Sequence, residues 1–146
     1  MIRQRRPWRS AGRWLRSATV SSVQDANVLV RGLVGASLEQ VCFGADGIQL
    51  NLSGQGHVAL AGPVREGEAD APAVPLLALL DRLAPLAQEQ ASISAVSVDE
   101  AGTLTLVLGA VTLTCSSDHA YESWTVTSDR GGPVICLPGG ELAVFE

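Results

Sequence analysis

The chain has 146 residues, which suits one domain with a buried core. Hydrophobic residues make up 47% of it and charged residues 17%, a balance that excludes an intrinsically disordered chain. No apolar run approaches the roughly 20 residues of a membrane-spanning helix, and no apolar segment follows the basic start as in a secretory signal, so we expect a cytoplasmic protein.

The charges are divided unevenly along the chain. Residues 1–16 hold six of the ten basic residues, all of them Arg, and no acidic residue. Residues 17–146 hold the other four Arg and all fifteen acidic residues, a net charge of −11. An acidic body repels nucleic acid and attracts basic partners, so a basic protein is the partner that the charge favours.

Residues 1–26 are predicted to be a flexible extension, separate from a single domain over residues 27–146. Arg mixed with Trp suits phosphate neutralisation with base stacking, or contact with an acidic membrane surface. A disordered extension without a role is the simpler interpretation, and the segment could also fold back onto the acidic domain. We expect deletion of residues 1–20 to leave stability unchanged. The basic segment contains Arg3, Arg5, Arg6, Trp8, Arg9, Arg13, Trp14 and Arg16.

Strand signals dominate the first half of the domain. The apolar run at 28–30 predicts a strand that opens the domain, and 38–43 predicts a second. Asp-Gly at 46–47 is a strong hairpin signal. Residues 48–53 then alternate between apolar and polar, which indicates a strand with one buried face. The strand predicted at 58–60 would pair back onto it.

A single persuasive helix follows an exposed loop. Residues 62–73 are rich in Gly, Pro and acidic residues and predict the loop, and residues 74–90 predict the helix. Pro75 suits the first turn, whereas Pro85 predicts a kink or an end near Leu83. We interpret the leucine stripe as core rather than as a groove for a partner. The stripe consists of Leu76, Leu77, Leu80, Leu83 and Leu86.

The second half of the domain resembles the first. Strands are predicted at 93–98, 104–108 and 111–114. The spacing Val-x-Phe-x₃-Gly at 41–47 recurs as Val-x-Val-x₃-Gly at 96–102, where every residue number is higher by 55. We interpret the halves as two related β-meander units separated by the helix, with chance similarity between alternating strands as the alternative.

The C-terminal segment, residues 119–146, holds the one cluster of aromatic, acidic and imidazole groups. Strands at 123–126, 134–137 and 142–145 would form a final hairpin and a short last strand. We expect the Trp124 indole to pack in the core with its N–H satisfied, and Glu122 to accept N–H groups from the turn at 138–140. Seven to nine short strands with one main helix near 74–90 predict an α+β fold, mostly antiparallel β.

Two motifs in this segment carry a resemblance to a known family. They are Tyr-Glu-x-Trp at 121–124 and Cys-Leu-Pro-Gly-Gly-Glu-Leu-Ala-Val-Phe at 136–145. Together with a similar stretch over 33–50, they resemble domain-of-unknown-function family 6188, a family of small actinobacterial proteins, over roughly residues 29–146. That family often ends in Trp where this chain has Phe145. The resemblance implies a shared fold and lineage, and it implies no catalytic residues.

Only the residues around His119 resemble a catalytic site. This imidazole could act as a base oriented by Asp118 or Glu122, with a nucleophile drawn from residues 115–117. A strand over 121–126 would place Tyr121 and Glu122 on opposite faces, so the groups would not converge locally. We therefore expect His119 to be a solvated loop residue and the chain not to be an enzyme.

Neither a metal site nor a cofactor is expected. The three cysteines show no CxxC motif and no His-spaced set, and we interpret them as buried apolar side chains. The glycine pairs are not followed by Lys-Ser or Lys-Thr, so they do not form a phosphate loop. The cysteines are Cys42, Cys115 and Cys136.

The composition and the motifs favour a non-catalytic protein-interaction module. One form would be an immunity-type protein that neutralises a basic toxin, such as a nuclease, by occupying its phosphate site. The alternative is a small-ligand or nucleic-acid binder that uses the N-terminal Arg/Trp segment, and a small enzyme using His119 comes third. The sequence identifies neither the partner nor the oligomeric state. The expected binding residues are His119, Tyr121, Glu122, Pro138, Gly139, Gly140 and Glu141.

Overall fold

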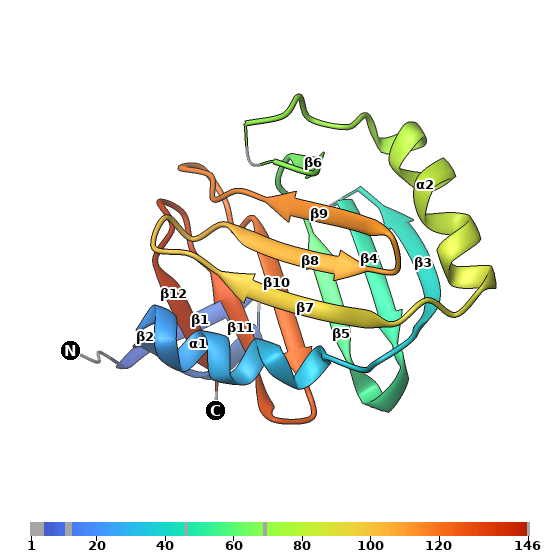
Figure 1. Cartoon of the computed structure of the whole chain (residues 1–146). Coiled ribbons are helices and arrows are strands. Elements are labelled where there is room, and N and C mark those ends of the chain that lie inside the picture. The colour runs from blue at the N-terminus through green and yellow to red at the C-terminus, as the bar shows by residue number, and fades with distance from the viewer. Residues whose placement is uncertain (1–4, 11–12, 46, 69, 146) are drawn as a thin grey trace.

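The computed structural model describes residues 5–10, 13–45, 47–68 and 70–145, whose strands form two antiparallel sheets (Figure 1). In spatial order, the larger sheet contains β1 (Arg5–Ser10), β2 (Arg13–Ser21), β12 (Leu142–Phe145), β11 (Gly131–Cys136), β10 (Trp124–Ser128), β5 (His57–Leu60), β4 (Gly47–Leu52) and β3 (Leu38–Gly44). The smaller sheet contains β6 (Val64–Glu66), β9 (Val111–Cys115), β8 (Leu104–Leu108) and β7 (Ile93–Val98). The helices are α1 (Val23–Val30) and α2 (Leu76–Gln88), with 3₁₀ turns η1 (Arg31–Leu33) and η2 (Ser53–Gln55).

The main core lies between the two sheets. In Figure 1, β7, β8 and β9 cross in front of β10, β5 and β4. Alternate residues of β4 and β8 are buried, as the period of two in the sequence predicted, because every second side chain of a strand points to the same face. The α+β fold class with mostly antiparallel strands is thereby confirmed.

The two predicted meanders are present and are related by their geometry. The strands β3, β4 and β5 form the first, and β7, β8 and β9 form the second. The register of the first shifts between Leu38 and Gln40, and that of the second shifts between Ile93 and Ala95, so both residue numbers are again higher by 55. A bulge at equivalent positions indicates that the likeness extends beyond alternation.

The two halves meet around an approximate two-fold axis. The Leu38 N–H donates to the Ala91 carbonyl at 2.8 Å, and the Ile93 N–H donates to the Ala36 carbonyl at 2.8 Å. At the offset of 55, Leu38 is equivalent to Ile93 and Ala36 is equivalent to Ala91. Exchanging the two halves therefore converts the first hydrogen bond into the second. The helices follow the same exchange, because α1 packs against β7 of the second meander and α2 packs against β3 of the first.

The strand predicted at 28–30 is wrong, because these residues belong to α1. The Ser22 hydroxyl caps this helix by accepting the Asp25 N–H at 3.0 Å, and Ala26 and Val30, four residues apart, are both buried. A capped start and this spacing favour a helix over a strand. The boundary expected between residues 26 and 27 consequently falls inside α1.

The described part of the N-terminal segment adds strands to the larger sheet. Strand β2 pairs with β12, with Ser21 opposite Leu142 and Ala18 opposite Phe145, and β1 pairs with β2. The binding role predicted for the Arg and Trp side chains of residues 3–16 falls on side chains that lie outside the described part of the structure.

Helix α2 extends through Pro85 to Gln88, so, of the kink or end expected near Leu83, the end is wrong and the kink stays a prediction. A proline lacks the N–H of one helical hydrogen bond, yet the exposed Pro85 does not stop this helix. The buried side chains are Leu79, Leu83 and Leu86. Leu76 and Leu77 are 46% and 77% exposed, so the interpretation of the whole leucine stripe as core is wrong for these two residues.

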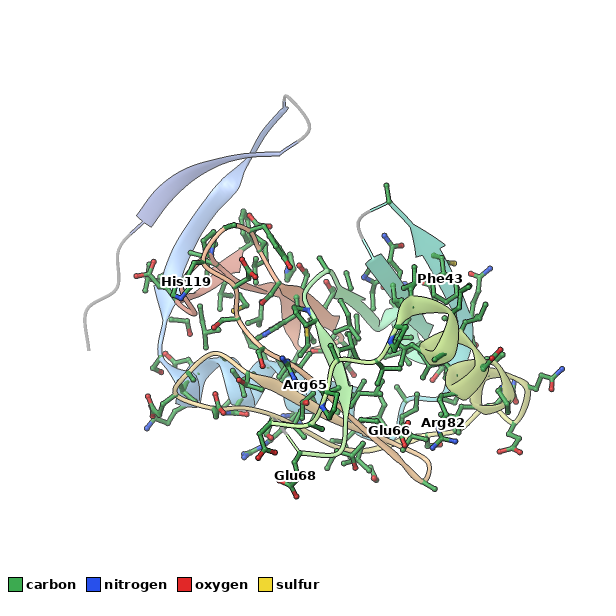
Figure 2. All side chains as sticks on the ribbon, turned by 90° about the horizontal axis from the view of Figure 1, so that it is seen from above. Phe43, Arg65, Glu66, Glu68, Arg82 and His119 are labelled. Carbon is green, nitrogen blue, oxygen red and sulfur yellow. The ribbon has the colours of Figure 1, made fainter. Side chains whose placement is uncertain are left out.

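The loop expected at 62–73 contains the short strand β6, which pairs with β9. Glu66 on β6 accepts two hydrogen bonds from Arg82 on α2, at 2.8 and 2.9 Å, and thereby ties the helix to the sheet (Figure 2). The Arg82 guanidinium holds the pKa of the Glu66 carboxyl below its usual value. None of the helices in the described part of the chain is long and apolar enough to cross a membrane.

Candidate functional site

A cleft of about 890 Å³ opens at one end of the larger sheet. The β3–β4 turn, the residues at the end of β5 and the start of β10 form its floor. The first residue of α2, the loop at 120–122 and Pro138 complete its walls. Segments that are distant in the sequence therefore come together at this cleft.

The floor of the cleft depends on a glycine. Gly47 has a φ of +116°, a conformation that favours glycine over residues with a side chain. A Cβ at this position would collide with the Leu60 carbonyl oxygen at the end of β5. The β3–β4 turn can thus lie directly against the neighbouring strand.

Exposed apolar side chains border the cleft. Leu76 and Tyr121 both line it, and Tyr121 is 41% exposed. We call these two residues, Leu76 and Tyr121, the apolar rim. Large apolar side chains that are exposed at a cleft are typical of binding surfaces.

The charge of the cleft is negative. Among the described residues that line it, Glu122 is the only one with a charged side chain. Asp118 lies next to this lining, and its carboxylate is fixed by accepting the Ala120 N–H at 2.7 Å. Partial desolvation, followed by the negative charge of Asp118, raises the pKa of the Tyr121 hydroxyl. The aromatic ring and the two carboxylates therefore share one small region.

A main-chain hydrogen bond joins the two C-terminal motifs, because the Ser123 N–H donates to the Cys136 carbonyl at 3.3 Å. In the turn that follows β11, the Gly139 N–H donates to the Asp118 carbonyl at 2.7 Å, and the Gly140 N–H donates to the Leu137 carbonyl at 3.0 Å. The pairing of this turn with Glu122 that the sequence suggested stays a prediction. The turn nevertheless connects the loop at 116–122 to β11, so Pro138 is held at the wall of the cleft beside Tyr121 and Glu122.

Trp124 supports the cleft from the core side. Its indole is buried, and its Nε1–H donates to the Gly102 carbonyl at 2.8 Å, as the sequence predicted. Gly140 packs against the same turn: a Cβ on Gly102 would lie 2.7 Å from the Gly140 carbonyl oxygen. Among the described residues, Tyr121, Glu122 and Pro138 line the cleft, whereas Gly139, Gly140 and Glu141 do not.

His119 is exposed and does not line the cleft. Figure 2 shows it across the molecule from Phe43. No hydrogen bond among the described residues joins it to residues 115–117. Burial raises the pKa of the Cys115 thiol to about 12, and the Ser117 hydroxyl donates to the Ala101 carbonyl at 3.1 Å. The described contacts thus do not form a nucleophile–base pair.

Metal binding has no evident site in the part of the chain that the structure describes, where no group of three His, Cys, Asp or Glu side chains could hold an ion. The three cysteines are free thiols, of which Cys115 and Cys136 are buried and Cys42 is partly exposed. The interpretation of the cysteines as buried apolar side chains therefore holds for two of them.

Sequence reasoning missed the half of the cleft that comes from the first meander and α2. The signal for Leu76 was present, because Leu79, Leu83 and Leu86 alone satisfy the helical spacing of a buried face and leave Leu76 and Leu77 outside it. The β3–β4 turn carried no comparable signal, since its position beside residues 120–122 results from long-range pairing.

Comparison with known proteins identifies the family. No curated protein and no solved structure matches this chain. A family model described as "Family of unknown function (DUF6188)" matches residues 29–146, which include both meanders and the described residues that line the cleft. The chain therefore belongs to the DUF6188 family of unknown function.

Proposed function

We propose that this chain is a non-catalytic protein-interaction module that binds a basic partner protein through the cleft. The observation that carries the proposal is the cleft itself, which combines an exposed apolar rim with a single lining carboxylate, that of Glu122. Apolar anchors surrounded by polar groups supply much of the affinity of protein interfaces, and complementary charge supplies specificity and speed of association.

The charge of the body supports a basic partner. Residues 17–146 carry a net charge of −11, which accelerates the approach of a positively charged surface. One form of this function is an immunity-type protein that covers the phosphate-binding site of a basic toxin in the cytoplasm of an actinobacterium. Binding by the N-terminal Arg/Trp segment is the competing function, and catalysis at His119 finds no support in the contacts around that residue.

Affinity capture from the native host tests the proposal. The full chain is compared with Leu76→Ser, which removes an apolar side chain from the cleft, and with Val34→Ser. Val34 is 49% exposed and does not line the cleft, so its substitution is a matched control. Melting curves must first show that the three proteins are equally folded.

We expect a stoichiometric basic protein that the parent and Val34→Ser retain, that Leu76→Ser loses, and that rising salt releases. Equal retention by Leu76→Ser would refute the role of the cleft. Recovery of nucleic acid alone, lost when the Arg residues of the N-terminal segment are replaced by Gln, would instead support the competing function.

A further inference from the structure

The two halves are related by an approximate two-fold axis, but they differ in how their equivalent turns are covered. The turn that ends at Gly102 is covered by the chain itself: Gly140 packs on it, and the Ser117 hydroxyl donates to Ala101. The equivalent turn of the first half, which ends at Gly47, lines the open cleft. The same structural element is thus a packing surface in one half and is accessible to solvent in the other.

The chemistry of the cleft restricts what can bind there. The floor contains several Gly and Ala residues beside the larger Gln49 and Trp124. Leu76 gives an apolar wall, and Tyr121 presents a partly exposed aromatic ring. Glu122 adds one negative charge. This combination is complementary to an apolar side chain next to one cationic side chain.

Arginine fits this combination better than lysine does. A guanidinium is planar, so it can stack on the Tyr121 ring while its N–H groups pair with a carboxylate, whereas an ammonium acts as a point charge. Glu122 has a further interaction within the chain, but a carboxylate has about four acceptor sites, so it can still accept hydrogen bonds from a partner. Asp118, beside Tyr121, adds to the negative potential.

We propose that the cleft recognises an arginine side chain of the partner protein, stacked on Tyr121 and paired with Glu122, with an adjacent apolar residue packed on Leu76. This inference rests on the proposed function, because it names the group of the partner that the interaction module recognises.

The probe is the dipeptide N-acetyl-leucyl-arginine amide, titrated into the ¹⁵N-labelled full chain at low salt and followed by amide chemical shifts. The citrulline analogue has the same shape without the charge, and the lysine analogue has the charge without the planar group. We expect shifts at the amides of Gly47, Tyr121 and Glu122. Binding of the citrulline analogue should be weaker by roughly tenfold, as expected for the loss of a charge-assisted pair, and the lysine analogue should also bind more weakly.

Three variants test the assignment of the residues. Glu122→Gln and Tyr121→Leu should each weaken binding of the arginine probe. Glu68→Gln removes the same charge from an exposed position outside the cleft and should not weaken it. Tyr121→Leu keeps an apolar side chain at an exposed position, so it provides a readout even if Glu122→Gln lowers stability.

Equal binding of the arginine and citrulline probes would overturn the inference, as would an equal effect of Glu68→Gln and Glu122→Gln. Shifts confined to residues outside the cleft would overturn it as well. Failure of this inference is distinguishable from failure of the proposed function. If a partner protein is captured in a way that depends on Leu76 but the cleft shows no preference for arginine, only the recognition of arginine is refuted. The proposed interaction module would then stand.

Discussion

The side chain of Asn27 closes the edge of the smaller sheet, and its isosteric replacement by Asp gives a sharp test of the fold. On α1, the Asn27 amide donates to the Val98 carbonyl at 2.9 Å and accepts the Val98 N–H at 2.9 Å, so it pairs with β7 as a neighbouring strand would. The same amide nitrogen also donates to the Val23 carbonyl at 3.0 Å.

The substitution Asn27→Asp keeps the shape and the bond from the Val98 N–H but replaces the amide nitrogen with an oxygen. Two hydrogen bonds are lost, each with a net value of about 1 kcal/mol. At neutral pH, the new carboxylate also faces the Val98 and Val23 carbonyl oxygens. We expect the free energy of unfolding to fall by about 3 kcal/mol at pH 7.

The sign of the pH dependence follows from the same geometry. Facing carbonyl oxygens disfavour the charged form, so the folded-state pKa of the introduced carboxyl group should lie above its unfolded value of about 3.9. The missing stability should therefore be partly restored below about pH 4 and lost again as the pH rises through the folded pKa.

Urea unfolding of the variant and the parent chain at several pH values measures both effects. The matched control is Asn51→Asp, because the Asn51 amide donates to the exposed Gln40 side chain at 2.9 Å and caps no strand edge. A loss below about 0.5 kcal/mol at pH 7, or the same loss in the control, would show that α1 does not close the sheet in this way.

Four further predictions concern the core, the cysteines and the N-terminal strands. Trp124→Phe removes the bond to the Gly102 carbonyl, whose other donor is the weak Cys136 thiol at 3.5 Å, and it leaves a cavity; urea unfolding should show a loss of about 3 kcal/mol. At pH 8, thiol reagents should modify Cys42 rapidly in the folded chain and all three cysteines after denaturation. Because burial raises the pKa of Cys115 from 9.0 to about 12, the free energy of unfolding should fall by about 1.4 kcal/mol per pH unit over that interval, and a flat profile would contradict the burial. Deletion of residues 1–20, which the sequence suggested would be neutral, removes the partner of β12; we now expect a lower Tm and association through the uncovered edge, measurable by calorimetry and light scattering.

The meanders could be predicted because the sequence signals for their strands and turns are local. Alternating burial on β4 and β8 appears in the sequence as alternating polarity, and the turns are marked by glycines. The repeat was visible in short motifs, and the bulges at Leu38 and Ile93 now confirm the relation. The closing of the halves around Ser37 and Ser92 depends on contacts between distant segments and had no local signal.

Helix α1 was missed because a short apolar run does not distinguish a strand from a helix. Val28, Leu29 and Val30 are β-branched or apolar and suggest a strand when considered alone. The better signal stood upstream, where Ser22 and Asp25 have the spacing of a helix cap, followed by Ala26 and Val30 at helical separation. The short length of this helix, eight residues, also favoured the interpretation as a strand.

Part of the candidate site could be predicted because several of its residues lie in the two C-terminal sequence motifs. Tyr121, Glu122 and Pro138 stand close to one another in motifs that also pair in space, and all three line the cleft. His119 is their neighbour in the sequence, but it is exposed and lies outside the cleft lining. The order of the strands in the larger sheet brings Gly47 to the floor of the cleft, and the packing of α2 on β3 brings Leu76 to its wall.

The likeness of the two halves explains why a binding surface would arise on one half only. Two equivalent turns end at Gly47 and Gly102, but the C-terminal strands follow the second half alone, and their turn at 138–140 covers Gly102. The same covering segment supplies Pro138 to the cleft beside the first turn. A single C-terminal addition therefore buries one of the two turns and builds a wall for the other. In such a molecule, the half without its own cover is where a partner would be expected to bind.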